Sequence, residues 1–302
     1  MPEPRRAAPR ILSLLPSSTE ISYRLGIGHQ LVGVTFECDE PAFARSVHPV
    51  VVGGLHTAGL TPAQIDSLVR SCIAAGENLY TLDLEQLKGL APDVILTQDL
   101  CRVCALPADN VTTALEALGC TAQVVTLDPH TLADVLTTIT IIGSCCDAEG
   151  AAVEVVNSLQ NRLDAVADAV ANQKRPRVFV LEWTDPAFIA GHWVPELVTA
   201  AGGTAILACP GERSIAVGWN DIVAASPDVV VVAPCGFGLD DAVNQARTVL
   251  PRLPAGAQVW AIDANAYTVR PGPRLVDGVE ALAWALHGDA VPAQSDRIVR
   301  IR

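Results

Sequence analysis

Two short stretches decide the fold, namely APDVIL at residues 91–96 and SPDVVV at residues 226–231. A second pair, AQV at residues 122–124 and at residues 257–259, repeats at the same offset of 135 residues, and Asp128 and Asp263 follow it. Two matches at one offset predict a chain of two structurally similar halves. Each half also opens alike, with a strand (11–15 or 178–181), a polar loop (16–19 or 182–191) and a helix (20–26 or 194–202).

Strand patterns alternate with helix patterns along the whole chain. Uninterrupted apolar runs at residues 94–96, 124–127 and 229–233 are typical of strands buried on both faces of a parallel sheet. Two intervening helices are expected to begin at capping boxes, Ser17-x-x-Glu20 and Thr131-x-x-Asp134. Alternating strands and helices of this kind predict doubly wound α/β lobes.

A single long helix is predicted between the two halves, over residues 148–172. Its apolar residues recur at steps of three and four and form one stripe: Val156, Leu159, Leu163, Val166 and Val170. The predicted architecture is therefore an N-terminal α/β lobe (1–146), a connecting helix (147–175) and a C-terminal α/β lobe (176–302), with a ligand cleft between the lobes. The alternative for this segment is an ordinary packed helix of one domain.

Composition narrows the classes of partner. The 302 residues carry a net charge of −13, which argues against a nucleic-acid partner and an anionic membrane surface. No uncharged apolar stretch reaches eighteen residues, so we expect no membrane insertion. The first apolar segment, residues 11–15, is too short for a secretory signal, and the nine cysteines are odd in number. These observations predict a cytoplasmic protein.

Several motifs together carry a resemblance to a known family. They are PSSTE at 16–20 with LG at 25–26 and LVGV at 31–34, FECDEP at 36–41, LAPDVILTQ at 90–98 with CxxC at 101–104, GHWVPE at 191–196 and YTVRPGPR at 267–274. In this order and spacing, which covers roughly residues 9–288, the chain resembles the helical-backbone substrate-binding proteins of ABC importers, and within them the cobalamin-binding branch.

The resemblance implies two lobes, a long helix between them and a ligand held with little lobe movement. It also implies docking on a permease through a surface glutamate of each lobe, and Glu196 falls near the position of the second. The expected function is a cytoplasmic binding protein for cobalamin or a related corrinoid or tetrapyrrole, and not an enzyme. The apparent lack of an export signal departs from the family and argues against a transport role.

Candidate ligand-binding residues follow the predicted strands, because ligands of open α/β sheets bind beyond the carboxyl ends of the strands. Tryptophan rings offer flat apolar area to a large ligand, and arginines pair with amides, carboxylates or phosphates. The alternatives are packing at a lobe edge and structural ion pairs. The predicted residues are Ser17, Ser18, Thr19, Cys38, Gln98, Trp183, His192, Trp193, Trp219, Arg270 and Arg274. Trp260 and Trp284 are expected in the core.

Cysteine and histidine side chains are the candidate metal ligands. Cys38, Cys101 and Cys104 follow strands of the first half, and such thiolates suit zinc, an iron–sulfur centre or the metal of a bound cofactor. Reduced thiols packed at strand ends are the alternative. His192 is a candidate axial ligand for the cobalt of a corrinoid, or else a hydrogen-bonding group.

No hydrolase, metalloprotease or P-loop motif is present, so no catalytic residue is predicted. Two functions remain as alternatives: a cysteine-ligated metalloenzyme or chelatase on a related two-lobed fold, and a siderophore-binding protein.

Overall fold

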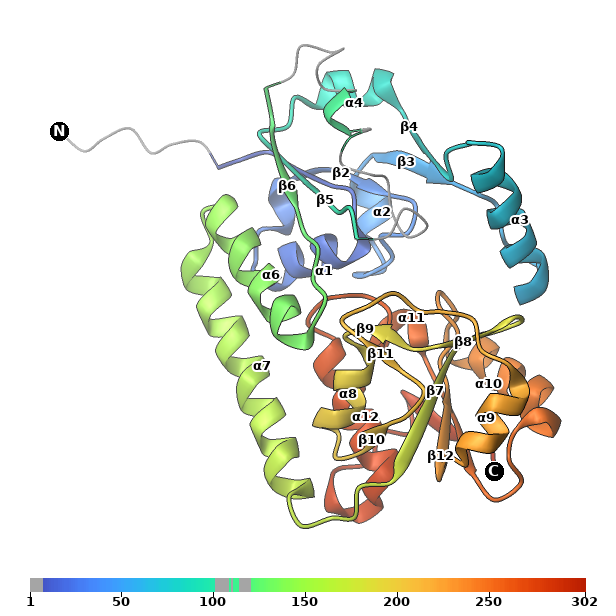
Figure 1. The fold of residues 1–302 in the computed structure, drawn as a ribbon. Coiled ribbons are helices and arrows are strands. Elements are labelled where there is room, and N and C mark those ends of the chain that lie inside the picture. The colour runs from blue at the N-terminus through green and yellow to red at the C-terminus, as the bar shows by residue number, and fades with distance from the viewer. Residues whose placement is uncertain (1–7, 101–108, 110, 114–120) are drawn as a thin grey trace. The chain divides into compact units, whose positions relative to one another are not determined.

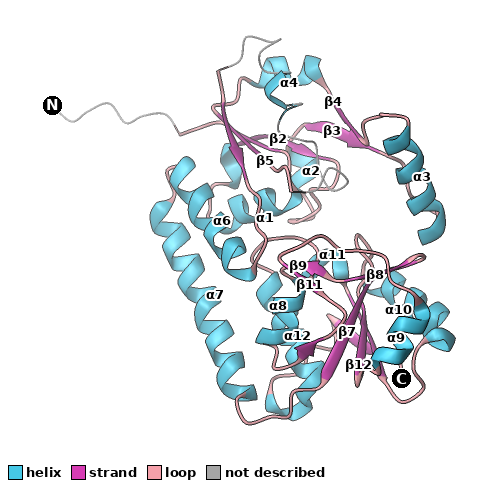
Figure 2. Cartoon of the chain, in the orientation of Figure 1, coloured by secondary structure: helices cyan, strands magenta, loops and turns pink. Residues whose placement is uncertain are grey.

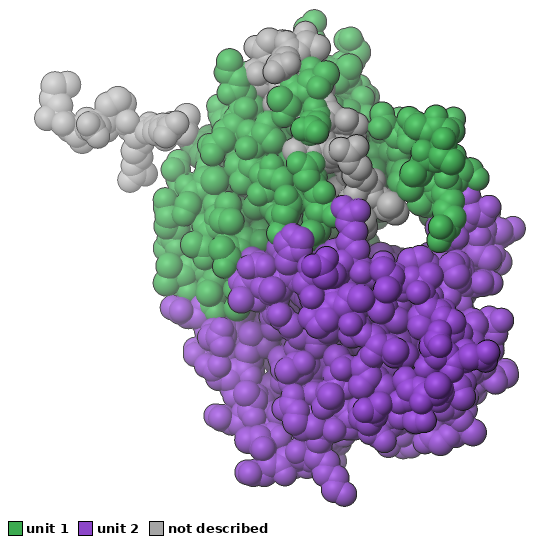
Figure 3. All heavy atoms as spheres, in the orientation of Figure 1, with its two compact units in different colours: residues 1–58, 68–128, 136–156 green, residues 59–67, 129–135, 157–302 purple. Residues whose placement is uncertain are grey.

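The computed structural model describes residues 8–100, 109, 111–113 and 121–302 (Figure 1). The chain divides into two compact units, shown in two colours in Figure 3. Unit 1 comprises residues 1–58, 68–128 and 136–156, and unit 2 comprises residues 59–67, 129–135 and 157–302. Each unit has its own predominantly parallel sheet, so the predicted α/β fold class is confirmed.

Unit 1 contains a six-stranded sheet in the order β4-β3-β2-β1-β5-β6. Its strands are β1 (Ile11–Ser13), β2 (Leu31–Thr35), β3 (Val50–Gly54), β4 (Tyr80–Leu82), β5 (Val94–Thr97) and β6 (Gln123–Thr126). All neighbours pair in parallel except β3 and β4. The order reverses at β1, as in a doubly wound sheet, so the loops after β1, β2 and β5 meet at one edge.

Among the described residues, the helices that begin before residue 149 are α1 (Pro16–Arg24), α2 (Ala44–Val47), α3 (Pro62–Ala74), α4 (Leu84–Leu90) and α6 (Leu132–Cys145). A short 3-10 turn, η1 (Gly28–Gln30), leads into β2. The core on one side of the sheet of unit 1 is built from Leu12, Val51, Leu87 and Ile95, each at most 2% exposed.

Unit 2 contains a second sheet in the order β10-β7-β12-β13-β14, with β8 paired to β7. Its strands are β7 (Arg177–Thr184), β8 (Ala187–Ile189), β10 (Thr204–Ala205), β12 (Val229–Val232), β13 (Gln258–Ile262) and β14 (Ile298–Arg300). A separate two-stranded sheet pairs β9 (Gly191–His192) with β11 (Cys209–Pro210).

Helices cover both faces of the sheet of unit 2 (Figure 2). On one side lie α8 (Val194–Ala200) and α12 (Leu275–His287), and on the other lie α9 (Trp219–Ala225) and α10 (Leu239–Val249). The short α11 (Ala264–Tyr267) follows β13, and two 3-10 turns, η2 (Leu250–Arg252) and η3 (Gly288–Ala290), follow α10 and α12. The fully buried Phe179, Leu181 and Val230 anchor the core beneath α9 and α10.

The internal repeat of the sequence is also a repeat of strand register. Val94 of β5 pairs with Gln123 of β6, and Val229 of β12 pairs with Gln258 of β13, each at the offset of 135 residues. The backbone bonds agree, since Gln123 N donates to Asp93 O at 2.8 Å and Gln258 N donates to Asp228 O at 2.9 Å.

The aspartate of each repeat also bonds the backbone at the start of the first strand, in chain order, of its sheet. The Asp93 carboxylate accepts from Arg10 N at 2.8 Å, and the Asp228 carboxylate accepts from Arg177 N at 2.7 Å. The residue before each proline ends its helix in the left-handed region, with φ of 40° at Ala91 and 48° at Ser226. The Pro-Asp stretch is therefore a joint between a helix and the strand that follows it in each unit.

The predicted long helix is α7 (Glu149–Val170), two residues shorter at the C-terminal end than expected. Its apolar stripe is inside, with Leu159, Val166 and Val170 buried. At about 1.5 Å per residue α7 is roughly 33 Å long. The boundary between the two units falls within α7, after Val156. Within the described part of the chain, no helix combines the length and apolar character needed to span a bilayer.

Of the two predicted capping boxes, one is absent and one is present. The Ser17–Glu20 capping box is wrong, because α1 begins at Pro16, whose fixed φ and missing N–H suit the first helical position. The second box is confirmed: Thr131 N donates to the Asp134 carboxylate at 2.9 Å, and Asp134 N donates to Thr131 Oγ1 at 3.1 Å.

The opening of unit 2 departs from that of unit 1. Most of the predicted polar loop 182–191 forms the antiparallel β7–β8 hairpin and the start of β9. Trp219, expected in a loop, is the first residue of α9.

Candidate functional site

The candidate residues of unit 1 meet where β1 and β2 end. Thr19 Oγ1, in the first turns of α1, lies 2.7 Å from Ser13 Oγ and 3.1 Å from Cys38 Sγ. Ser13 Oγ and Ser18 Oγ lie 2.6 Å apart. All four of these side chains are 0% exposed. Ser18, Thr19 and Cys38 therefore come together in a buried hydrogen-bonded network, and their role as ligand-binding residues stays a prediction.

The other candidates of unit 1 are buried beside this network or lie outside the described residues. Ser17 and Gln98 are 5% and 7% exposed, and Gln98 directly follows β5. Cys101 and Cys104 fall outside the residues that the structure describes, so the proposed three-cysteine set stays a prediction. Within the described ranges no group of three or more His, Cys, Asp or Glu side chains is placed to hold a metal.

In unit 2 the loops that follow β7, β12 and β13 are linked by direct contacts. Trp183, near the end of β7, meets Phe237 edge-on with ring centroids 5.6 Å apart, and its Nε1 donates to Asp185 O at 3.2 Å. Phe237, after β12, accepts at its carbonyl from Asn265 N at 3.1 Å. Asn265 Oδ1 in turn accepts from the Arg270 guanidinium at 3.0 Å. An aromatic pair and an arginine therefore share the carboxyl edge of one sheet, where ligands of such sheets bind.

Trp193 holds the loop that carries Arg270. Its indole is only 6% exposed, and its Nε1 donates to Thr268 O at 2.8 Å. Arg270 is itself 8% exposed, and Arg274 is half-buried at the start of α12. The indole of Trp193 thus lies inside unit 2, where it positions the 268–270 segment.

His192 is fixed by backbone bonds on both sides. Its N donates to Glu212 O at 2.6 Å, and its carbonyl accepts from Gly211 N at 2.9 Å. The preceding residue must be glycine, since a Cβ at Gly191 would lie 2.4 Å from Glu212 O. His192 has a φ of 49°, a left-handed conformation that few residues other than glycine adopt.

The imidazole of His192 lies between other aromatic rings. Its centroid is 5.6 Å from that of Trp193 and 6.4 Å from that of His130. Burial lowers the pKa of His192, the charges of His130 and Arg213 lower it further, and Glu212 partly opposes them. The neutral imidazole, which is the form that binds metals, is therefore favoured.

His130 is a residue that the sequence reasoning missed. It follows β6 by a few residues, and its Nδ1 lies 2.9 Å from Gly211 O. The rule that selected residues after each strand would have found His130 if it had been applied to β6. Nothing in the sequence shows, however, that residues 129–135 join unit 2.

The remaining tryptophans are engaged in packing. Trp219 packs against the core under α9, and the Arg252 guanidinium carbon lies 4.7 Å from its ring centroid. Trp260 and Trp284 form an edge-to-face pair at 5.6 Å within β13 and α12, as expected for core residues.

Glu196 lies on α8 and caps another helix of the chain. Its Oε2 accepts from Leu132 N, the first residue of α6, at 2.7 Å. A carboxylate in this position is stabilised by the helix dipole. Glu196 also borders an open hollow of about 440 Å³ on unit 2, together with Arg175, Thr199 and Pro210.

Comparisons with known proteins agree with this architecture. The family model described as "Periplasmic binding protein" matches residues 11–258. The chain is 25% identical over 293 residues to an uncharacterized ABC transporter substrate-binding lipoprotein, YvrC of Bacillus subtilis, covering 93% of this chain and 80% of that protein. It is 24% identical over 287 residues to a vitamin B12-binding protein of Vibrio cholerae, covering 92% and 89% of the two chains.

Solved structures show the same fold. The periplasmic vitamin B12 binding protein BtuF of Vibrio cholerae superposes with a TM-score of 0.67 at 23% identity, covering 92% of this chain and 96% of that one. A periplasmic heme binding protein from Pseudomonas aeruginosa gives a TM-score of 0.72 at 21% identity, covering 97% and 98%.

The expectation of a cytoplasmic protein is wrong. The relatives are named as a lipoprotein of an ABC transporter and as periplasmic binding proteins, so they work outside the cytoplasm. The expectation depended on the short first apolar segment and on the odd number of cysteines. The relatives are also named as binding proteins rather than enzymes.

Proposed function

This chain belongs to the periplasmic binding protein family, and from that premise we propose that it binds cobalamin or a related corrinoid or tetrapyrrole. As a substrate-binding protein related to those of ABC importers, it is expected to capture a small molecule without transforming it. The ligand class is the specific part of the proposal.

The observation that carries the proposal is the set of contacts among the loops that follow β7, β12 and β13 of unit 2. Trp183 and Phe237 supply a half-buried aromatic surface, and Arg270 is joined to the same loops through Asn265. A macrocycle needs a flat apolar surface, and the amide or carboxylate groups at its rim need a donor such as guanidinium. The sequence relative named for vitamin B12 supports the corrinoid over other flat ligands.

The test is a titration of the full chain with aquocobalamin, followed by visible absorption and by tryptophan fluorescence. All five tryptophans belong to unit 2, so the fluorescence reports that unit alone. We expect saturable quenching, and Trp183→Ala should weaken binding by roughly tenfold through lost stacking area. Trp284→Ala is the matched control, because it removes an indole that packs on Trp260; it should lower stability and leave affinity unchanged.

Other ligands are outcomes of the same experiment. Hemin should be titrated in parallel, with the Soret band as readout. If hemin saturates the protein while several corrinoids give no change, the ligand is a tetrapyrrole other than a corrinoid. If only a ferric siderophore saturates it, the proposal is wrong. An absorbing metal centre in the purified protein, without added ligand, would instead support the metalloenzyme alternative.

The surface around Glu196 is the part of unit 2 that we propose contacts an ABC permease. Glu196→Gln keeps an acceptor for Leu132 N and removes the charge, whereas Glu196→Ala removes both. If the charge is needed for docking, both variants lose ligand-stimulated transport in reconstituted vesicles, and only Glu196→Ala loses stability. Normal transport by Glu196→Gln would confine Glu196 to its capping role.

A further inference from the structure

Two imidazoles of unit 2 share one structural support, the turn that follows β11. Gly211 and Glu212 of this turn bond the backbone of His192, and Gly211 O bonds the ring of His130. His192 is thereby held in a left-handed conformation, and strain of this kind persists only where the surroundings fix it. The two rings are therefore positioned by the same few residues, although they are separated by more than sixty positions in the sequence.

Each imidazole has a nitrogen that the fold leaves for another partner. His130 Nδ1 lies against a backbone carbonyl and donates to it, which leaves Nε2 as the nitrogen that could face a metal. Metal-binding histidines are typically oriented by this kind of bond. His192 Nε2 is screened from solvent and has no hydrogen-bond partner among the described residues. A buried polar atom in this state points to a ligand.

We propose that His130 and His192 bind one divalent transition-metal ion of the Co²⁺, Ni²⁺ and Zn²⁺ class through their Nε2 atoms. This site goes beyond the proposed corrinoid function and does not depend on it. The ring centroids lie 6.4 Å apart. A metal–nitrogen bond of about 2.1 Å places the ion about 3.2 Å from each centroid, so the two rings can just reach a common ion.

A common ion at this separation would have the two Nε2 atoms on nearly opposite sides, which is the trans arrangement of an octahedral site. The side chain of His130 is exposed and is held at Nδ1 by Gly211 O, whereas His192 is half-buried. The described residues supply no third His, Cys, Asp or Glu ligand here, so water or an added small ligand completes the coordination. The adjacent negative charge of Glu212 favours a cation, and Arg213 opposes it.

The experiment uses the full chain, stripped with chelator and titrated with CoCl₂ by calorimetry and visible absorption. We expect one ion per chain, a ligand-field spectrum of imidazole and water, and no near-ultraviolet thiolate band. His130→Ala and His192→Asn should each weaken binding by about tenfold or more. Asparagine is chosen because it tolerates the left-handed conformation of residue 192. His56→Ala removes an exposed histidine elsewhere and is the control.

Every outcome decides the proposal. Loss in both variants, with wild-type melting curves and unchanged His56→Ala, supports a shared site. Unchanged Co²⁺ binding in either variant overturns it, as does a thiolate band that accounts for all of the bound cobalt. A titration with aquocobalamin distinguishes binding of the free Co²⁺ ion from binding of cobalt that is already held in a macrocycle. A corrinoid with one open axial position needs only one imidazole, so sensitivity confined to His192→Asn and to aquocobalamin also overturns the paired site.

Discussion

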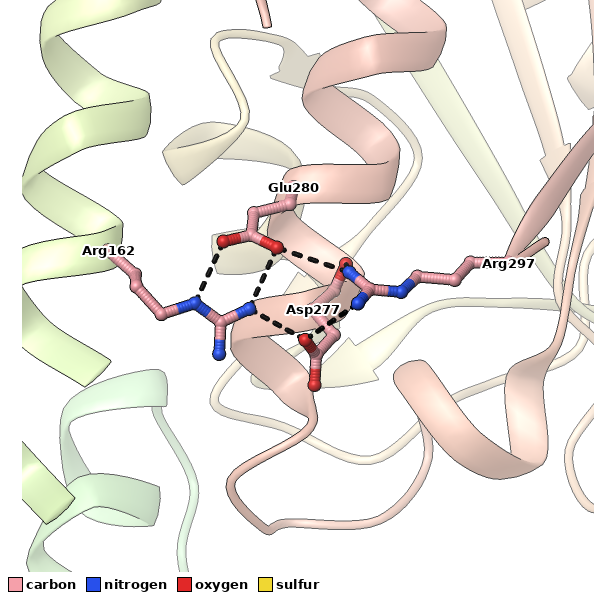
Figure 4. A network of polar contacts seen from close by, with 4 residues as sticks. All are labelled: Arg162, Asp277, Glu280 and Arg297. Atoms are coloured by element: carbon pink, nitrogen blue, oxygen red, sulfur yellow. Dashed lines mark hydrogen bonds and ion pairs between the residues drawn. The ribbon is translucent and has the colours of Figure 1, made fainter. Parts of the chain in front are cut away.

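Replacing Arg162 by methionine should destabilise unit 2 by removing the centre of an ion network between α7 and α12 (Figure 4). Arg162 Nε donates to Glu280 Oε1 at 2.8 Å. Arg162 Nη2 donates to Glu280 Oε2 at 2.7 Å and to Asp277 Oδ1 at 2.6 Å. Arg297 approaches the same two carboxylates at 3.1 and 3.2 Å. Two positive and two negative groups therefore balance, and Arg162→Met leaves one negative charge in excess.

The size of the effect follows from burial. The side chains of Arg162, Asp277 and Glu280 are 30%, 17% and 22% exposed, between a surface pair and a buried one. Exposed pairs contribute about 0–1 kcal/mol, and breaking a buried pair costs about 3–5 kcal/mol. We expect a loss of about 2 kcal/mol in the free energy of unfolding, or about 4–8 °C in melting temperature. Methionine keeps much of the side-chain volume, so the loss reports the network rather than a cavity.

Denaturant unfolding followed by tryptophan fluorescence measures this loss in unit 2. Arg247→Met, on the exposed face of α10, is the matched control and should change stability by less than about 0.5 kcal/mol. A double-mutant cycle with Glu280→Gln should give a coupling of about 1 kcal/mol or more. If Arg162→Met unfolds at the wild-type denaturant concentration, or if the cycle gives no coupling, the network does not stabilise the unit and the reasoning fails.

The pH dependence provides a second readout with a definite sign. Burial alone would raise the pKa of Glu280, but the bonds and charges of Arg162 and Arg297 hold it below its ordinary value. A group with a depressed folded-state pKa contributes stability that is present above its unfolded pKa and lost as the pH falls through the folded pKa. The difference between wild type and Arg162→Met should therefore shrink as the pH is lowered through that range, and a difference independent of pH would contradict the ionic explanation.

Two further substitutions and one labelling experiment test other parts of unit 2 and the burial of Cys146. Trp193→Phe removes the donor to Thr268 O. It should weaken aquocobalamin binding about five- to tenfold in a titration and lower stability by about 1 kcal/mol in denaturant unfolding. Unchanged affinity would show that the loop carrying Arg270 does not need this hydrogen bond. Asp228→Ala should destabilise by about 1–2 kcal/mol in fluorescence-detected unfolding, and a neutral result would contradict the role of the Pro-Asp joint. In native protein, a thiol reagent should react with the exposed Cys235 and not with the buried Cys146, because burial raises the pKa of the Cys146 thiol to about 12. Peptide mapping identifies the labelled cysteine. Rapid labelling of Cys146 would contradict its burial.

Features set by local pattern were predictable from the sequence. The repeat at residues 91–96 and 226–231 predicted two sheets, and the structure repeats even the strand register. The stripe from Val156 to Val170 predicted α7 to within two residues at its C-terminal end. These predictions hold because strand burial and helix periodicity depend on residues that are close in the chain. The exact domain boundaries and the ligand roles of the candidate residues stay predictions.

Features set by distant partners were not predictable. A Trp in a loop looks the same whether it faces a ligand or, like Trp193, donates to a carbonyl seventy-five residues away. His130 has no local signal, because its position depends on Gly211, eighty-one residues later. Ser17 failed as a cap for a local reason, since two helix-start signals competed and Pro16 took the first position.

The division of the chain has a consequence for its synthesis. Unit 2 includes residues 59–67 and 129–135, which leave the ribosome well before the strands of its own sheet exist. Unit 1 is complete only when translation reaches residue 156, partway through α7. Neither unit is one continuous segment of the chain. The part of unit 2 that is synthesised first therefore lacks its partners until the rest of that unit has been translated.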